Sequence, residues 1–227
     1  RRADDRVSRW LYERWYRPNR VNPNMLLAAA LARFVNLPEA LARTGFPKVW
    51  DPEKLRRLLP GPKVFNSAYM VRCDAGINKI EYVVERCLRP LVENPPVVDS
   101  NSMERTWGAL TPYYGFGSFM AGQVIADLRW GWSGAWRDRW DWAPSGPGSL
   151  RGLNRIYGRD PGDRAAHRNW GEEFPATRKL ISEALPGLAA RLEAIDYQNV
   201  LCEVDKYERA LWGQGRPKQL YRPQEVF

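Results

Sequence analysis

The segment from Thr111 to Leu128, TPYYGFGSFMAGQVIADL, contains residues that could bind a phosphate group. Gly115 and Gly117 flank Phe116, and glycine readily adopts the positive φ angles that a tight hairpin requires. Ser118 is predicted to cap a helix that starts directly behind the hairpin. Backbone amides at a helix N-terminus favour anions, so the hairpin residues 115–118 are predicted to contact DNA. An ordinary turn between two helices would show the same glycine pattern.

The helix behind the hairpin places two polar side chains on one face. Apolar residues recur at near-helical spacing between Phe119 and Leu128. Gln123 and Asp127 are four residues apart, so both should project from the same side of this helix.

Several kinds of active site are disfavoured by residues that the chain lacks. The single histidine, His167, excludes a multi-histidine metal site and disfavours a serine or cysteine nucleophile with a histidine base. The three cysteines are widely spaced and odd in number, which predicts neither a zinc site nor a disulfide framework. Reduced cysteines are typical of a cytosolic protein. No GxxxxGK[ST] motif occurs, so the sequence encodes no P-loop kinase site.

The charge balance predicts a polyanionic partner. The 227 residues include 35 Lys and Arg against 26 Asp and Glu, for a net charge of +9. Nucleic acid is the first choice of partner and a membrane surface the second, while a merely solvated basic surface is the alternative. No apolar run reaches the length of a membrane span.

The apolar pattern predicts an all-α fold of about ten helices, because no segment alternates convincingly with period two. The helices could form two lobes around a cleft. The chain is predicted to be a single helical domain over residues 1–227. A helix-hairpin-helix element is expected near residues 104–128, and a loosely ordered tail from residue 214.

Capping signals mark the ends of individual helices. Asn78, followed by Glu81 three residues later, predicts a capping box. Asp196 is predicted to cap the last long helix, with Gly213 just past its C-terminal end. The polar segment from Arg159 to Gly171 is predicted to be irregular.

Four elements, in this order, resemble the helix-hairpin-helix DNA glycosylase superfamily: NPNMLLAAALARFVN, a capped amphipathic helix, YYGFGSFMAGQVIADL and a loop leading into LRGLNRIYG. The likeness covers residues 22–157. Those glycosylases use an aspartate after the loop behind the hairpin helix, whereas here Gly146 stands at about that place and Asp141 is displaced from it. Bifunctional members carry a lysine just behind the hairpin, where this chain has Ser118 and Phe119. The resemblance therefore implies the scaffold and leaves the glycosylase reaction in doubt.

Four stretches are similar to a phage-associated branch of that superfamily: WYRPNRVNP, VFNSAYMVR, GPGSLRGLNR and LCEVDKYER. This branch comprises the alpha-glutamyl/putrescinyl thymine pyrophosphorylases and the helical domain of 5-hydroxymethyl-deoxyuridine DNA kinases. The resemblance implies hypermodification of thymine in DNA. A kinase activates 5-hydroxymethyluracil as a pyrophosphate ester, and a transferase then displaces pyrophosphate with an amino acid or polyamine. The missing P-loop favours the transferase.

Such a transferase must reach a base that lies inside a duplex. The base is flipped out or met in a single strand, and aromatic side chains stack on it. Trp136, Trp140 and Tyr69 are the stacking candidates, although most of the eleven tryptophans are expected to pack in the interior. Trp136 and Arg137 join Gly115, Phe116, Gly117 and Ser118 as predicted DNA-contacting residues.

Pyrophosphate departure needs concentrated positive charge, and the forked guanidinium of arginine suits phosphate oxygens. The candidate pyrophosphate-binding residues are Arg17, Arg20, Arg33, Tyr69, Arg72 and Lys206. For each arginine, a surface ion pair is an equally weighted alternative, and Arg33 could merely snorkel at the edge of a buried helix stripe.

The incoming amine must lose a proton, which a carboxylate could accept. The candidate catalytic residues are Asp127, Asp141, Arg151, Asn154 and Glu203, with Asp205 as a further choice of carboxylate. Asn154 would either read the uracil edge or cap a turn, and Glu203 could instead pair with Lys206. No cofactor is required; Mg²⁺ could accompany the pyrophosphate, but no residue pattern demands a metal site.

Two alternatives to the transferase remain open. One is a DNA N-glycosylase that uses Asp141, and the other is a non-catalytic DNA-binding module. The expected partners are DNA that contains modified thymine and an amino acid or polyamine co-substrate, with no membrane. The resemblance implies a location in the cytoplasm of a phage-infected bacterial host.

Overall fold

The computed structural model of the protein describes residues 5–61, 64–65, 73–74, 76–131 and 136–215. All regular secondary structure in these residues is helical, which confirms the predicted all-α fold. The first half contains α1 (Arg6–Trp10), η2 (Leu11–Tyr16), η3 (Arg17–Asn19), α2 (Met25–Val35), α3 (Pro38–Thr44), α4 (Pro52–Leu58), α5 (Lys79–Glu81), η5 (Tyr82–Leu88) and α6 (Arg89–Glu93). The second half contains α7 (Met103–Leu110), α8 (Gly117–Gly131), η6 (Arg137–Trp140), α9 (Pro147–Ile156), α10 (Ala165–Arg168), α11 (Trp170–Ala184), α12 (Pro186–Ala189) and α13 (Ala194–Leu211).

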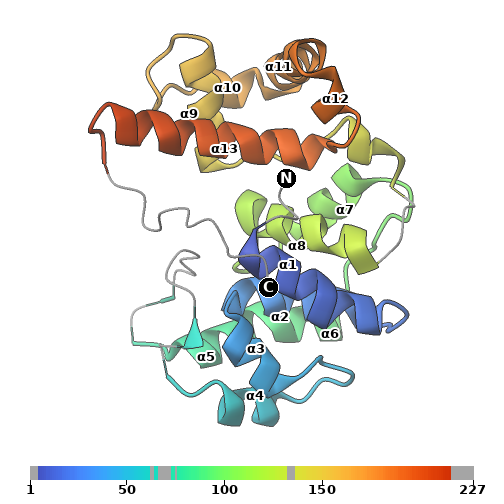
Figure 1. Ribbon diagram of the computed structural model, residues 1–227. Coiled ribbons are helices and arrows are strands. Elements are labelled where there is room, and N and C mark those ends of the chain that lie inside the picture. Colours follow the sequence, from blue (N-terminus) through green and yellow to red (C-terminus); the bar gives the residue numbers. More distant parts are fainter. Residues whose placement is uncertain (1–4, 62–63, 66–72, 75, 132–135, 216–227) are drawn as a thin grey trace.

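The helices form two groups with α7 and α8 between them (Figure 1). Helices α1–α6 lie at one end of the molecule and α9–α13 at the other. Each group has its own cluster of buried apolar side chains. Helix α8 contributes to both clusters, for example through Ile125 in the first and Ala126 in the second. Helix α8 is therefore the element through which the two groups are positioned relative to each other.

The N-terminal helix changes its winding in the middle. Asp5 caps it by accepting a hydrogen bond from the Ser8 amide at 2.9 Å, and helical structure then runs without a break from Arg6 to Asn19. The segment η2 is π-helical, and the Arg17 amide that follows it donates to the Tyr12 carbonyl five residues back. π-Helical turns are rare and frequently occur at functional sites.

At one point the backbones of helices α9 and α13 lie so close together that no side chain fits between them. A Cβ atom added to Gly152 would lie 2.0 Å from the Leu201 carbonyl oxygen, so the two backbones are in direct contact there. One turn earlier, a Cβ atom on Gly148 would lie 3.1 Å from Cys202 Sγ. The close approach of the two helices accounts for two of the glycines in the GPGSLRGLNR segment.

Three of the sequence-based predictions about local structure are wrong. Asn78 caps α5 through the Ile80 amide, but Glu81 bonds Arg56 instead of completing a capping box. Asp196 lies inside α13, and its carboxylate accepts from the amide of Glu193, the residue that precedes this helix. The segment predicted to be irregular contains α10 and the start of α11. Gly213, with a φ of 64°, follows α13 as predicted.

None of the helices in the described ranges is both long and apolar enough to cross a membrane.

Candidate nucleic-acid site

The turn between α7 and α8 depends on its two glycines. Gly115 has a φ of 81° and Gly117 a φ of 50°, as the sequence predicts. Gly115 is also required for space, because an added Cβ atom would lie 2.5 Å from Cys87 Sγ. The turn therefore delivers the amides of residues 117 and 118 to the N-terminus of α8, where an anion would be favoured.

Two residues of this turn have roles other than the predicted ones. Ser118 does not cap α8: it lies within the first turn of the helix, and its hydroxyl donates to the Ser145 carbonyl at 3.2 Å. The carbonyl of Phe116 accepts the first helical hydrogen bond, from Met120. The Phe116 ring is buried and meets the Phe34 ring edge-on, with 5.1 Å between ring centroids. Phe116 could therefore contact DNA through its backbone but not through its ring.

A small groove lies beside the first turns of α8. Its walls come from α8, from the loop before α9 and from the start of α13; they comprise Ser118, Phe119, Gly122, Gln123, Pro144, Ser145, Gly146, Ile195 and Gln198. None of these lining residues is ionisable. Gly146, which stands where the glycosylase aspartate would be expected, lies against Gln198 and Phe119. The groove therefore supplies no carboxylate for the glycosylase reaction.

Asp127 lies further along α8, in the interior. Its carboxylate accepts from Arg33 Nε at 2.6 Å and from the Tyr16 hydroxyl at 2.7 Å, and the Arg33 Nη2 atom donates to the other carboxylate oxygen. Arg33 also donates to Asn36 Oδ1 at 3.1 Å. The side chains of Arg33 and Asp127 are 2% and 0% exposed. The structure thus brings together a predicted pyrophosphate ligand and a predicted catalytic carboxylate, and they neutralise each other out of reach of solvent.

The remaining predicted catalytic residues are distributed over the α9–α13 end of the molecule. Arg151 donates to the buried carboxylate of Asp205 at 2.8 Å. The buried Asn154 amide nitrogen donates to two carbonyls of the following loop, Pro161 and Asp163, which supports the turn-capping alternative. No hydrogen-bond partner is found for Asn154 Oδ1 among the described residues.

The exposed candidates form pairs of opposite charge. Glu203 and Lys206 bond each other at 2.6 Å on the surface of α13, which is the alternative that their spacing left open. Asp141 bonds Arg178 at 2.9 Å, and the Asp141 side chain is 74% exposed. Asp141 is not among the residues that line the groove beside α8.

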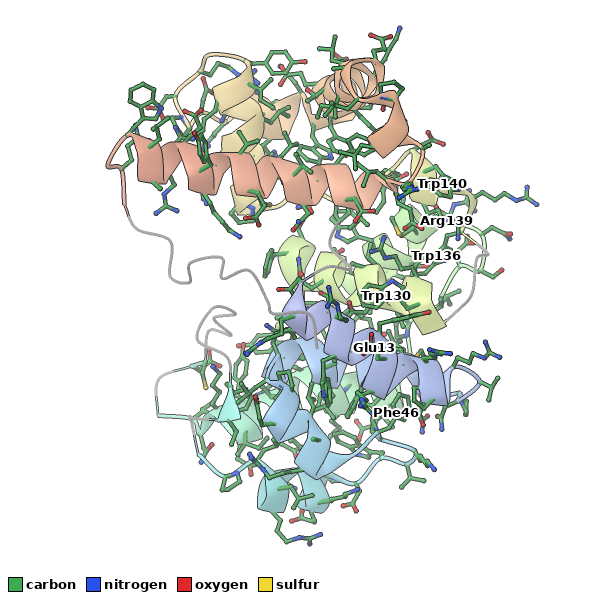
Figure 2. The ribbon with its side chains drawn as sticks, in the orientation of Figure 1. Glu13, Phe46, Trp130, Trp136, Arg139 and Trp140 are labelled. Carbon is green, nitrogen blue, oxygen red and sulfur yellow. The ribbon has the colours of Figure 1, made fainter. Side chains whose placement is uncertain are left out.

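The tryptophan-rich segment is anchored to α7. The buried indole of Trp136 donates its N–H to the Asp99 carbonyl at 2.7 Å, so this ring is part of the interior. Asp138 accepts hydrogen bonds from the Met103 and Glu104 amides and thereby caps α7. Trp140 is 47% exposed, with the Arg139 guanidinium 4.8 Å from its ring centre (Figure 2). Of the stacking candidates in this segment, only Trp140 presents a ring to solvent.

The N-terminal helix carries unpaired positive charge. Arg17 and Arg20, both predicted phosphate ligands, are exposed and form no ion pair with another described residue. The same holds for three arginines that sequence reasoning missed: Arg6, Arg9 and Arg14. Arg6 and Arg14 have no acidic residue three or four positions away, which was their signal in the sequence. Arg9 carries no such signal, because Asp5 and Glu13 each lie four positions from it. The exposed Arg137 also lacks an ion-pair partner in the described part of the chain, whereas Tyr69 and Arg72 lie outside the described residues.

Three pKa shifts belong to side chains that are engaged in the fold. Burial raises the pKa of Cys87 to about 12, so this thiol is unreactive at neutral pH. A hydrogen bond from Arg89 holds the pKa of Glu85 below its usual value, and one from Arg159 does the same for Glu173. No group of three or more His, Cys, Asp and Glu side chains in the described ranges could hold a metal ion.

Together these features define an all-helical module with a glycine turn at a helix N-terminus and a strip of unpaired arginines. Comparison with known families gives a more specific assignment. The family described as "5-hmdU DNA kinase, helical domain" matches residues 1–216, where 5-hmdU is 5-hydroxymethyl-deoxyuridine. The chain therefore belongs to this family. No curated protein and no solved structure matches the chain.

The family match extends over more of the chain than the predicted glycosylase likeness. It supports an enzyme system that modifies DNA, with DNA as the partner. It names the helical domain of kinases, not the pyrophosphorylases that the sequence motifs also resemble.

Proposed function

We propose that this protein binds DNA that contains a 5-hydroxymethyluracil derivative and completes its hypermodification by displacing pyrophosphate with an amine. The observation that carries the proposal is the family match over residues 1–216 in a chain whose sequence contains no P-loop motif. The step that follows phosphorylation needs no P-loop, so these 227 residues are suited to it.

The proposed reaction exchanges one bond at the base. The C–O bond between the C5-methylene group and pyrophosphate breaks, and a C–N bond to the incoming amine forms. Pyrophosphate leaves with the bonding electron pair, and the amine loses one proton. Stabilisation of the departing charge would be the largest catalytic contribution, since preorganised positive groups act most strongly where charge develops.

The exposed arginines are suited to this contribution. Arg17 follows the π-helical segment directly and Arg20 follows η3. Neither is engaged by an acidic side chain of the described chain. Arg33, in contrast, is fully occupied by Asp127 and Asn36. Arg17 and Arg20 are therefore the predicted pyrophosphate ligands that the fold supports best. The amine proton would pass to solvent.

A non-catalytic DNA-binding module is the second candidate. One observation favours it: Asp127, Asp141, Glu203 and Asp205 are each bonded to an arginine or a lysine. A carboxylate that is already bonded to a cationic side chain is not free to bind an incoming amine. In this alternative the helical protein would present the modified base to a separate catalytic domain.

Nucleoside mass spectrometry separates the two candidates. The protein is incubated with DNA that carries 5-pyrophosphoryloxymethyl-deoxyuridine and a mixture of amino acids and polyamines. The transferase predicts released pyrophosphate and a nucleoside whose mass equals one amine condensed on the methylene group. Unchanged DNA with retained binding identifies the binding module, and abasic sites would indicate a glycosylase.

A matched pair of variants connects the result to the arginine strip. The double substitution Arg17→Gln/Arg20→Gln should reduce product formation at least tenfold, because two groups that contact the charged substrate are removed. Arg164→Gln/Arg191→Gln removes two exposed arginines from the other end of the molecule and should have little effect. Equal losses in both variants would mean that only net charge matters.

A further inference from the structure

A pocket with a volume of about 380 Å³ opens beside the N-terminal helix, away from the groove at α8. Its aromatic walls are Trp10, Trp15 and Phe46, and its polar groups are Arg14 and Asn19. Figure 2 shows Phe46 next to the helix that carries Glu13. The volume lies at the small end of the range for ligand sites, which suits a ligand the size of a nucleotide.

The aromatic walls are held in fixed positions. Trp15 donates its indole N–H to the Ala28 carbonyl at 3.2 Å, and its ring lies 5.4 Å from the Phe46 ring centre and 6.3 Å from that of Trp10. Gly45, at the end of α3, has a φ of 66° and open space where a Cβ atom would be. The glycine therefore turns the chain so that Phe46 faces Trp15 without filling the pocket.

The polar side chains of the pocket keep hydrogen-bonding groups that no described residue uses. Asn19 donates its amide nitrogen to the Trp15 carbonyl at 2.8 Å, and no described residue bonds its amide oxygen. Arg14 is exposed and forms no ion pair with a described residue. The pocket therefore offers a hydrogen-bond acceptor, the amide oxygen of Asn19, and a cation, Arg14, beside its aromatic wall.

The positive charge around the pocket favours a nucleotide over an amine as its ligand. An amine such as a polyamine could in principle bind an aromatic cage. Arg14, with Arg17 and Arg20 further along the same helical segment, would repel it. A nucleobase gains from stacking on aromatic rings without carrying positive charge, and its phosphate would be attracted by Arg14.

We propose that this pocket binds a single unstacked pyrimidine nucleotide of a DNA strand, with the base against Trp10 and Phe46 and a flanking phosphate on Arg14. The inference rests on the proposed function only in taking DNA as the partner, and it requires no chemistry at the pocket. Two consecutive residues connect the pocket with the interior. Trp15 lines the pocket, while the next residue, Tyr16, holds the buried Asp127.

Photochemical cross-linking tests the position of the base. A single-stranded oligonucleotide with one 5-iododeoxyuridine is bound to the full chain and irradiated, and the adduct is located by peptide mass spectrometry. The expected adduct is on Trp10, Trp15 or Phe46. An adduct on another exposed ring such as Trp140, or none in a complex that has formed, would overturn the proposal.

Binding measurements with matched variants test the contribution of the base. The affinity for the oligonucleotide is compared with that for the same strand with an abasic residue at the central position. The unmodified chain should prefer the base-containing strand about fivefold or more, in line with aromatic stacking. Phe46→Leu should remove this preference while keeping abasic-strand binding. Arg14→Gln should weaken both strands, and Arg191→Gln neither.

Three outcomes would contradict the proposal in different ways. A preference that persists in a folded Phe46→Leu protein would overturn the pocket while leaving DNA binding intact. Absence of binding to any DNA would overturn the proposed function together with it. A change in tryptophan emission on addition of spermidine alone, lost in Phe46→Leu, would assign the pocket to an amine instead.

Discussion

Two aspartates in this molecule are buried and held by arginines, but water reaches their partners to very different extents. Asp127, at the α2–α8 contact, is bonded by Arg33, whose side chain is 2% exposed. Asp205, at the α9–α13 contact, is bonded by Arg155, which is 10% exposed, and by Arg151, which is 38% exposed. The first ion pair is sealed in the interior, whereas the second has one partner at the surface. The Arg33–Asp127 pair is therefore assigned a purely structural role, whereas Arg151 in the second group could still bind a ligand.

Breaking the sealed pair should have the largest effect. Asp127→Asn would leave the Arg33 guanidinium buried without a counter-charge, and removal of one member of such a pair costs about 3–5 kcal/mol. The free energy of unfolding, measured by urea denaturation, should fall by about that amount.

A double variant provides the control for this prediction. Arg33→Met combined with Asp127→Leu removes both charges, so it should recover much of the lost stability. If Asp127→Asn keeps full stability but loses all modification activity, Asp127 is catalytic and the structural assignment is wrong.

Breaking the second pair should have a smaller effect. Asp205→Asn leaves two arginines without their shared carboxylate, but Arg151 can turn into water. The expected loss is about 1–3 kcal/mol, the range for an unsatisfied buried polar partner. A loss equal to that of Asp127→Asn, measured under the same denaturant conditions, would contradict the comparison.

Local sequence signals predicted the helices well, because capping and periodicity act over a few residues. Asn78 caps α5, the glycine turn precedes α8 and Gly213 follows α13, each as expected. The failures were also local in origin. Glu81 and Asp196 were assigned to capping positions, but tertiary contacts or a neighbouring residue took those roles.

The candidate site was harder to predict, since its contacts join distant parts of the chain. Arg33 and Asp127 were both selected from the sequence, but 94 residues separate them and no pattern shows that they bond. Trp136 was selected for stacking on DNA, whereas its indole N–H donates a hydrogen bond to the carbonyl of Asp99, 37 residues away in the sequence. The aromatic pocket joins Trp15 to Phe46, and neither residue was singled out.

The smallest effect on stability is expected for Arg151, the exposed member of the second pair. Arg151→Gln leaves Asp205 bonded to Arg155, and a partly exposed ion pair contributes about 1 kcal/mol or less. Arg155→Gln is the matched control and should cost more, because its side chain is 10% exposed.

DNA binding then distinguishes the two possible uses of Arg151. If Arg151 also contacts a phosphate, Arg151→Gln should reduce the slope of log affinity against log salt by about one, and Arg155→Gln should leave the slope unchanged. An unchanged slope in both variants would mean that the pair at Asp205, like the one at Asp127, serves only the fold. The exposure of Arg151 favours the first result, because a guanidinium at the surface can bond a phosphate oxygen while Arg155 continues to neutralise the buried carboxylate.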